Sequence, residues 1–144
     1  MIGRRTVAAA TAALGLTQIV GYGTLYYSFS ILAPAIAAEF RLSQEWVFAA
    51  LSGALFAGSL FAPLAGRWAD RYGAGRIMTF GSAAAAVALT FCALAPGRVS
   101  FVLALLAMEL ASCLVFYSFA FVALVQLGGP RPQRSIVHLT LIAG

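Results

Sequence analysis

Long runs of apolar residues, interrupted by short groups of charged or turn-forming residues, dominate the sequence. No charged residue occurs between Arg5 and Glu39, and this interval exceeds the roughly 20 residues that a helix needs to cross the hydrocarbon core of a membrane. Three more apolar runs follow, each ended by charged residues, proline or glycine. The predicted membrane spans are residues 6–38, 46–64, 77–95 and 100–127.

The apolar runs indicate helices. The strands of a membrane β-barrel alternate in polarity over about 10 residues, whereas residues 82–89 (SAAAAVAL) are apolar on every side. We therefore predict an all-α integral membrane protein with four complete spans. The run 136–144 is too short to cross a membrane, and we expect it to begin a fifth helix in a sequence truncated within that helix. A four-span protein with a short interfacial tail is the alternative.

Composition and charge support this class and add an orientation. The chain is 62% hydrophobic and 9% charged, with a mean hydropathy of +0.96, against about 45–50% and about 25% in soluble domains. If the N-terminus is cytoplasmic, seven of the nine arginines fall in inside loops and two in outside loops. The positive-inside rule predicts this orientation in a cytoplasmic (inner) membrane. The net charge of +5 thus reflects topology, and we expect no nucleic-acid partner.

One acid, Glu109, lies within a predicted span. It follows Val99 by ten residues, which places it about 15 Å deep at 1.5 Å per residue, near the centre of a core about 30 Å thick. Ionising a carboxyl group there costs a few kcal/mol even on lenient scales. We expect Glu109 to take up and release a proton; a permanently protonated, hydrogen-bonded glutamate is the structural alternative.

Polar and small residues mark the first two spans. Gln18, Tyr22, Tyr26 and Ser30 follow one another at i, i+4 spacing and predict a polar stripe on the first helix. The stripe indicates either the wall of a substrate or proton pathway or hydrogen bonds between helices. In the second span small residues recur at every fourth position and predict close packing against another helix. These residues are Ala50, Ala54, Gly58, Ala62 and Gly66.

The sequence contains no motif of enzymatic chemistry, and we expect no catalytic residue and no cofactor. Cys92 and Cys113 lie in spans and lack the spacing of a metal site, so we expect neither a metal ion nor a disulfide. His138 lies at the start of the incomplete fifth helix and is predicted to be an interface residue.

The loop between the second and third spans carries a recognisable motif, Gly66-Arg67-Trp68-Ala69-Asp70-Arg71-Tyr72-Gly73-Ala74-Gly75-Arg76. It resembles the signature G-x-L-A-D-R-x-G-R/K-R/K of the major facilitator superfamily of secondary transporters, which occupies the same loop on the cytoplasmic side. Trp68 replaces the usual leucine, and Ala74-Gly75 replaces the basic pair, with Arg76 next to it. The fourth-helix motif of the family's proton-coupled antiporters is absent, because Glu109 stands where that motif has arginine.

The resemblance implies a twelve-helix fold in which residues 1–144 form the N-terminal part of the first six-helix half and the remaining helices complete the transporter. It also implies that the first and fourth helices line the cavity, so that Glu109, Gln18, Tyr22 and Tyr26 are the candidate substrate- or proton-binding residues. The gating motif implied for the loop comprises Gly66, Asp70, Arg71, Gly73 and Arg76.

The function predicted from these features is transport of a small solute across the lipid bilayer by alternating access, coupled to protons. Two alternatives remain open: a complete small four-helix transporter of the multidrug type that acts as a dimer, and a membrane scaffold or split-gene remnant that transports nothing. The dimeric transporters place their essential acid in the first helix, where this chain has none.

Overall fold

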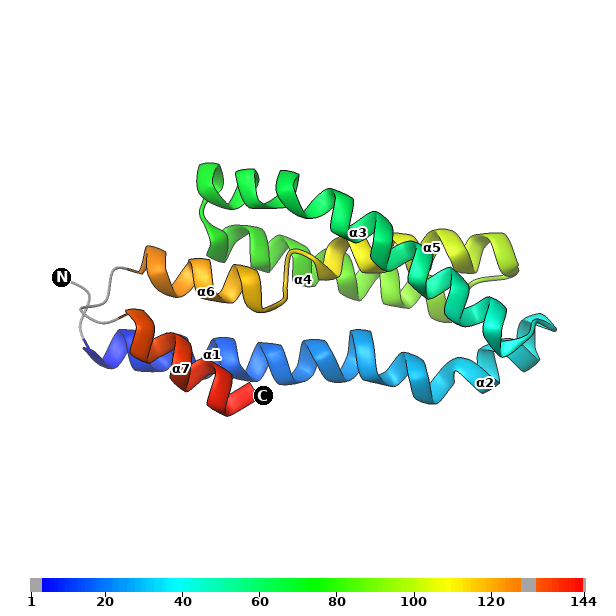
Figure 1. The fold of residues 1–144 in the computed structure, drawn as a ribbon, viewed down its shortest axis with the longest axis horizontal. Coiled ribbons are helices and arrows are strands. Elements are labelled where there is room, and N and C mark those ends of the chain that lie inside the picture. Colours follow the sequence, from blue (N-terminus) through cyan, green and yellow to red (C-terminus); the bar gives the residue numbers. More distant parts are fainter. Residues whose placement is uncertain (1–3, 128–131, 144) are drawn as a thin grey trace.

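The computed structural model describes residues 4–127 and 132–143, and every regular element in these ranges is helical. Helix α1 (Arg4–Gly21), the π-helix η1 (Tyr22–Tyr27) and α2 (Ser28–Phe40) follow one another directly. They are followed by α3 (Gln44–Tyr72), α4 (Ala74–Ala93), α5 (Arg98–Ser112), α6 (Tyr117–Gln126) and α7 (Pro132–Ala143). The helices lie side by side along the long axis of the molecule (Figure 1).

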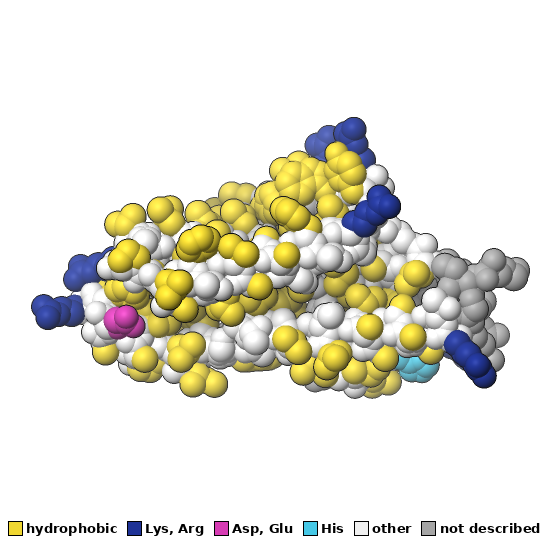
Figure 2. Space-filling model, turned by 180° about the vertical axis from the view of Figure 1, so that it is seen from behind, with side chains coloured by type: hydrophobic (Ala, Val, Ile, Leu, Met, Phe, Trp, Pro, Cys, Tyr) yellow, Lys and Arg dark blue, Asp and Glu magenta, His cyan; other side chains and the backbone are white. Residues whose placement is uncertain are grey.

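Four helical stretches are long and apolar enough to cross a membrane: Arg5–Phe40, Gln44–Tyr72, Ala74–Ala93 and Arg98–Gln126. These stretches confirm the all-α class, and they are four candidate membrane spans, as expected of a multi-pass membrane protein. On the face shown in Figure 2, charged side chains gather at the two ends and apolar side chains cover the middle. We call the end where α3 meets α4 the motif end, and the other the opposite end.

The reversals between helices follow from individual residues. At the opposite end, α2 stops where Arg41 adopts a left-handed conformation (φ 52°), and the hydroxyl of Ser43 then caps α3 by accepting from the Trp46 N–H at 3.2 Å. At the motif end, Gly73 has φ 89° and alone separates α3 from α4. Only glycine adopts such a value without strain. The predicted loop is therefore shorter than expected, because residues 66–72 belong to α3.

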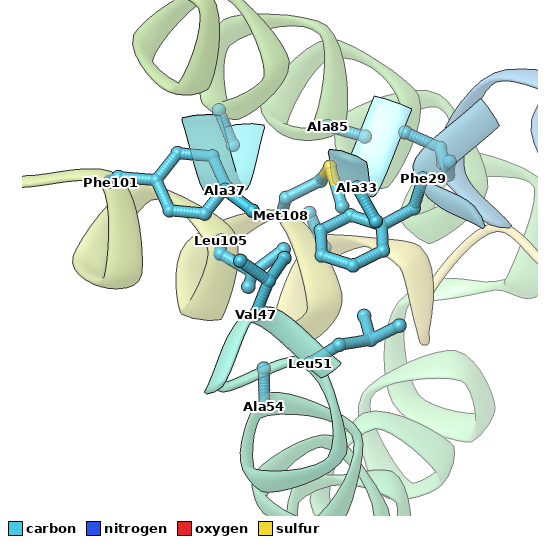
Figure 3. Packing of buried hydrophobic residues seen from close by; sticks show 13 residues of the cluster. Phe29, Ala33, Ala37, Val47, Leu51, Ala54, Ala85, Phe101, Leu105 and Met108 are labelled. Atoms are coloured by element: carbon cyan, nitrogen blue, oxygen red, sulfur yellow. The ribbon is translucent and has the colours of Figure 1, made fainter. Parts of the chain in front are cut away.

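A core of aromatic and aliphatic side chains fixes the opposite half of the bundle. Figure 3 shows Phe29 of α2, Val47 and Leu51 of α3, and Phe101 and Leu105 of α5 converging among small alanine side chains. A second cluster, which includes Leu114, Phe119, Leu124 and Leu139, fills the motif half.

The predicted fifth helix begins earlier than expected, at Pro132, as α7. It packs on α1, where a Cβ atom added to Gly15 would lie 2.7 Å from Cγ2 of Ile142. Among the described residues only the four stretches above reach the length of a membrane span. The predicted inside loop 128–135 falls partly outside the described residues.

The prediction of one continuous helix over 100–127 is wrong in the middle. Helix α5 ends at Ser112, α6 begins at Tyr117, and residues 113–116 form an irregular turn between them (Figure 1). The sequence of this turn, Cys113-Leu114-Val115-Phe116, contains neither glycine nor proline. The reason for the break therefore has to lie in the contacts that other helices make with it.

Candidate functional site at the break in the fourth span

The break replaces regular helical hydrogen bonds by tighter ones. The N–H groups of Leu114 and Val115 reach back three residues, to the carbonyls of Ala111 and Ser112, at 3.0 and 2.9 Å. Phe116 is then extended (ψ 177°), and its carbonyl starts α6 by accepting from Phe119 at 3.0 Å. The backbone thus leaves the helix for one turn about halfway along the span.

The extended residue frees backbone groups that a continuous helix would pair. Among the described residues, nothing donates a hydrogen bond to the carbonyls of Cys113 and Leu114. Irregular backbone at membrane depth is tolerated only where it is buried in protein or lines a polar cavity. The carbonyl of Val115 is paired with a side chain from another span, because Nε2 of Gln18 in α1 donates to it at 2.8 Å. Gln18 is fully buried, with 0% of its surface exposed.

Two glycines on neighbouring helices make room for the break. A Cβ atom at Gly81 of α4 would lie 2.5 Å from Cβ of Leu114, and one at Gly58 of α3 would lie 2.9 Å from Sγ of Cys113. Such distances are far inside ordinary carbon and sulfur contacts. The close approach predicted for the small residues of the second span is confirmed at Gly58. Ala62 is exposed, and the buried face continues instead through Ala65 and Ala69.

Glu109 lies in the last turn of α5 and is 2% exposed. Its Oε2 accepts a hydrogen bond from the Ser112 hydroxyl at 3.3 Å, and the same hydroxyl donates to the Glu109 carbonyl at 2.8 Å. Its Oε1 has no partner among the described residues. The thiols of Cys92 and Cys113 lie near enough to interact electrostatically with the carboxyl group. Glu109 is thus buried within the predicted span, and its side-chain partner, Ser112, belongs to the same helix.

The π-helix changes the predicted stripe on the first span. A π-turn contains more residues per turn than an α-helix, so residues at i, i+4 spacing drift off one face. Gln18 is buried and Tyr22 is partly buried, but Tyr26 is 43% exposed and Ser30 is exposed. The inward positions belong to Leu25 within the π-helix and Phe29 in α2. The stripe therefore reaches the break only through Gln18 and Tyr22.

An aromatic group covers the break on the side of the first span. The ring of Tyr22 stacks on Phe116 with 4.3 Å between centroids, and Tyr117 lies 5.4 Å from Tyr22. The Tyr117 hydroxyl is buried and has no partner among the described residues. Sequence reasoning missed Tyr117 and Gly81, and the only signal for Gly81 is that it is a lone glycine within a helical run.

At the motif end, the residues of the signature lie on α3 and at the start of α4. Asp70 and Arg71 are exposed in the last turn of α3, Gly73 makes the reversal, and Gly66 and Arg76 lie one to two turns away. The N–H of Ala74 at the start of α4 donates to the side chain of Gln126, at 2.8 Å.

Gln126, at the end of α6, joins the fourth span to this hairpin. Its Oε1 accepts from the N–H of Ala74, and its Nε2 donates to the carbonyl of Ala69 at 3.3 Å. One side chain therefore ties the end of α3 to the start of α4. Sequence reasoning missed this contact, because a glutamine near the end of a predicted span carries no signature of its own.

A cavity of about 200 Å³ lies elsewhere, in the opposite half of the bundle. Its walls are mainly apolar and come chiefly from η1, α2, α4 and α5. None of the candidate residues Gln18, Tyr22 and Glu109 lines this cavity, although Cys92 and Met108 do. In the described part of the chain, no group of three histidine, cysteine or acidic side chains is placed to hold a metal ion.

The sequence was compared with protein-family models and with curated proteins, and the structure with solved structures; none matches this chain.

Proposed function

We propose that this protein is a secondary transporter of the major facilitator type, in which the described helices belong to the first six-helix half. It moves a small solute across the cytoplasmic membrane by alternating access, and proton movement at Glu109 drives the solute. The signature at the motif end supports the family, and the seven-to-two distribution of arginines supports a cytoplasmic N-terminus.

The observation that carries the coupling role is the surroundings of Glu109. The carboxyl group is almost completely buried in an apolar bundle, and one of its oxygens has no hydrogen-bond partner among the described residues. An ionised carboxylate at such depth is costly, so the closed bundle favours the neutral acid. Loss of the proton requires a conformation in which water or substrate reaches the carboxylate.

The break in the fourth span supplies a place at which the conformation can change. A helix interrupted by four irregular residues can bend there without losing many further hydrogen bonds. Glu109 lies one turn before the break, so bending alters its surroundings directly. Protonation and opening are thereby linked, because each conformation favours one protonation state.

The experiment measures whether a transported solute drives protons across the membrane. The whole protein is reconstituted into liposomes that contain a pH-sensitive dye, and sugars, amino acids, organic acids and amines are added in turn. We expect at least one solute to move protons in the wild type and in Glu45→Gln, which alters an exposed acid in the first turn of α3. Glu109→Gln should abolish this proton movement, because glutamine keeps the size of the side chain and cannot titrate.

Two outcomes contradict the proposal. Proton movement of wild-type size in Glu109→Gln shows that the coupling group lies elsewhere. The absence of both solute and proton movement across the whole panel in the wild type contradicts secondary transport and favours a membrane scaffold.

A further inference from the structure

The cavity of about 200 Å³ in the opposite half of the bundle is an elongated groove. Its wall on the first span extends from Thr24 in η1 to Phe40 at the end of α2, which corresponds to about 24 Å at 1.5 Å per residue. The facing wall comes from the last turns of α4 and from α5. The groove is therefore parallel to the helices, where α2 faces α4 and α5.

Apolar side chains form the floor of the groove. Figure 3 shows three of them, Phe101, Leu105 and Met108 of α5, all of which are buried. Leu32 of α2 and Leu89 of α4 also line the groove, but they are 51% and 38% exposed. These two residues form its rims, so the groove opens to the side of the bundle. In a bundle that spans a membrane, such an opening admits molecules from the lipid phase.

The shape and polarity of the groove fit a hydrocarbon chain. Water does not occupy a space that offers it no polar partners, and a cavity of about 150 Å³ with similar walls already holds a benzene ring. A hydrocarbon chain that enters the groove restores the dispersion contacts that its walls would otherwise lack. The hydroxyls of Thr24 and Ser28, farthest from the charged end, donate to carbonyls of their own helix. That end of the groove therefore suits an apolar tail.

At its other end the groove reaches charged groups. Glu39 lines it and is exposed. Beside Glu39, the carbonyl of Phe40 accepts a hydrogen bond from Nε of Arg98 at 3.0 Å. The ring of Phe40 packs on Phe101 with 5.1 Å between centroids, and both rings line the groove. A carboxylate and a guanidinium group thus lie at the same mouth of the groove.

The balance of charge at this mouth indicates the headgroup. The opposite end of the bundle carries two acids, Glu39 and Glu45, and two arginines, Arg41 and Arg98, so it has no net charge that would attract an anionic lipid. An ammonium group that has N–H donors forms a charge-assisted hydrogen bond with a carboxylate, and a guanidinium group matches a phosphate. A choline group has no N–H to donate. The mouth therefore fits a zwitterionic headgroup with a primary ammonium group.

We propose that this groove binds a phospholipid with an ethanolamine headgroup. Its acyl chain lies along α2, its ammonium group pairs with Glu39 and its phosphate lies against Arg98. Because lipid tails in the bilayer are as apolar as the walls of the groove, the tail alone gives little selectivity, and the headgroup decides which lipid is bound. The inference goes beyond the proposed function and does not depend on transport, so each can fail separately.

The test is native mass spectrometry of the purified whole protein, titrated in detergent with phosphatidylethanolamine, phosphatidylcholine and phosphatidylglycerol that carry identical chains. We expect the ethanolamine lipid to bind roughly threefold to fivefold more tightly than the other two, the usual effect of one exposed ion pair. Glu39→Gln should remove this preference. Glu45→Gln should keep it, because Glu45 is an exposed acid at the same end that does not line the groove.

A second pair of variants tests the position of the tail. Ala93 lines the groove and Ala83 does not, and both are exposed in α4, so neither substitution crowds the core. Ala93→Phe places a ring in the groove and displaces at least two CH₂ groups of the chain, so it should weaken binding of all three lipids roughly tenfold. Ala83→Phe should bind like the wild type.

The two cysteines report where the lipid lies. Both are partly buried, and Cys92 lines the groove whereas Cys113 does not. Bound phosphatidylethanolamine should slow the alkylation of Cys92 by a small maleimide and leave that of Cys113 unchanged, as measured on each peptide by mass spectrometry.

Three results overturn the proposal. The first is equal binding of the three lipids by the wild type, and the second is an unchanged preference for the ethanolamine lipid in Glu39→Gln. The third is wild-type lipid binding by Ala93→Phe together with unprotected Cys92, which places the lipid outside the groove.

Discussion

Adding one methyl group at Gly81 should destabilise the bundle at the break. The new Cβ atom of Gly81→Ala would lie 2.5 Å from Cβ of Leu114, 3.2 Å from Cγ2 of Val115 and 3.4 Å from the carbonyl oxygen of Ala111. Carbon atoms pack best at about 3.5–4.0 Å, so α4 and the break have to separate by roughly 1 Å. A Cβ atom is attached to the backbone and cannot rotate out of the way.

The size of the effect follows from two opposing contributions. Forcing an extra carbon into a packed interior costs about 1–3 kcal/mol, and a contact this short belongs at the upper end. Alanine favours a helix by about 0.8–1 kcal/mol over glycine. The expected net destabilisation of Gly81→Ala is about 2 kcal/mol.

Other glycines give a graded series. Gly53 lies in the interior of α3 with nothing within 4 Å of its added Cβ atom, so Gly53→Ala should be neutral or slightly stabilising. Gly58→Ala should fall between the two, because the atom it meets, Sγ of Cys113 at 2.9 Å, is the end of a side chain that can rotate. The order of stability is therefore Gly53→Ala, then Gly58→Ala, then Gly81→Ala.

The assay is thermal unfolding in detergent, followed by a fluorogenic thiol reagent. The chain has two cysteines, Cys92 and Cys113, and both are partly buried, so unfolding exposes them. Circular dichroism on the same samples separates unfolding from a local change in thiol reactivity. If Gly81→Ala unfolds at the same temperature as Gly53→Ala, the close packing of α4 against the break is refuted.

Three further predictions concern the first span, the topology and the motif. Gln18→Leu should destabilise the protein by about 1–3 kcal/mol, since it leaves the Val115 carbonyl buried and unpaired. The control Thr17→Val, at an exposed position, should have little effect. Equal unfolding temperatures for the two variants contradict this prediction. In intact cells without native cysteines, Ser43→Cys should react with an impermeant maleimide and Arg71→Cys should not; the reverse pattern overturns the proposed orientation. Asp70→Asn should impair solute uptake more than membrane insertion, which immunoblotting of membranes measures; wild-type uptake reduces the motif to a topology signal.

The sequence was sufficient for the features that depend on local composition. Apolar runs longer than a membrane is thick predicted all four spans, because the cost of exposing backbone to lipid leaves the helix as the only solution for such runs. The burial of Glu109 followed from its depth, since an acid within a span has to face protein or water.

The sequence did not reveal those features of the candidate site that depend on contacts between helices far apart in the chain. The break at residues 113–116 contains no helix-breaking residue. It forms where Gln18 supplies a donor to a freed carbonyl and Gly81 lets α4 approach, and neither partner is near in sequence. The π-turn at 22–27 likewise rotated Tyr26 outward, which a regular periodicity of 3.6 residues could not anticipate.

The most direct test of the central claim is to separate accumulation from exchange in Glu109→Gln, with the solute that moves protons in the reconstituted wild type. Under an imposed pH gradient, the wild type and Glu45→Gln should concentrate the radiolabelled solute inside the liposomes. Glu109→Gln should fail to concentrate it and yet exchange internal for external solute at a rate near that of the wild type, because substrate binding and alternating access do not need the titration. If Glu109→Gln accumulates the solute against its gradient with the pH dependence of the wild type, Glu109 does not carry the coupling proton and the account is wrong.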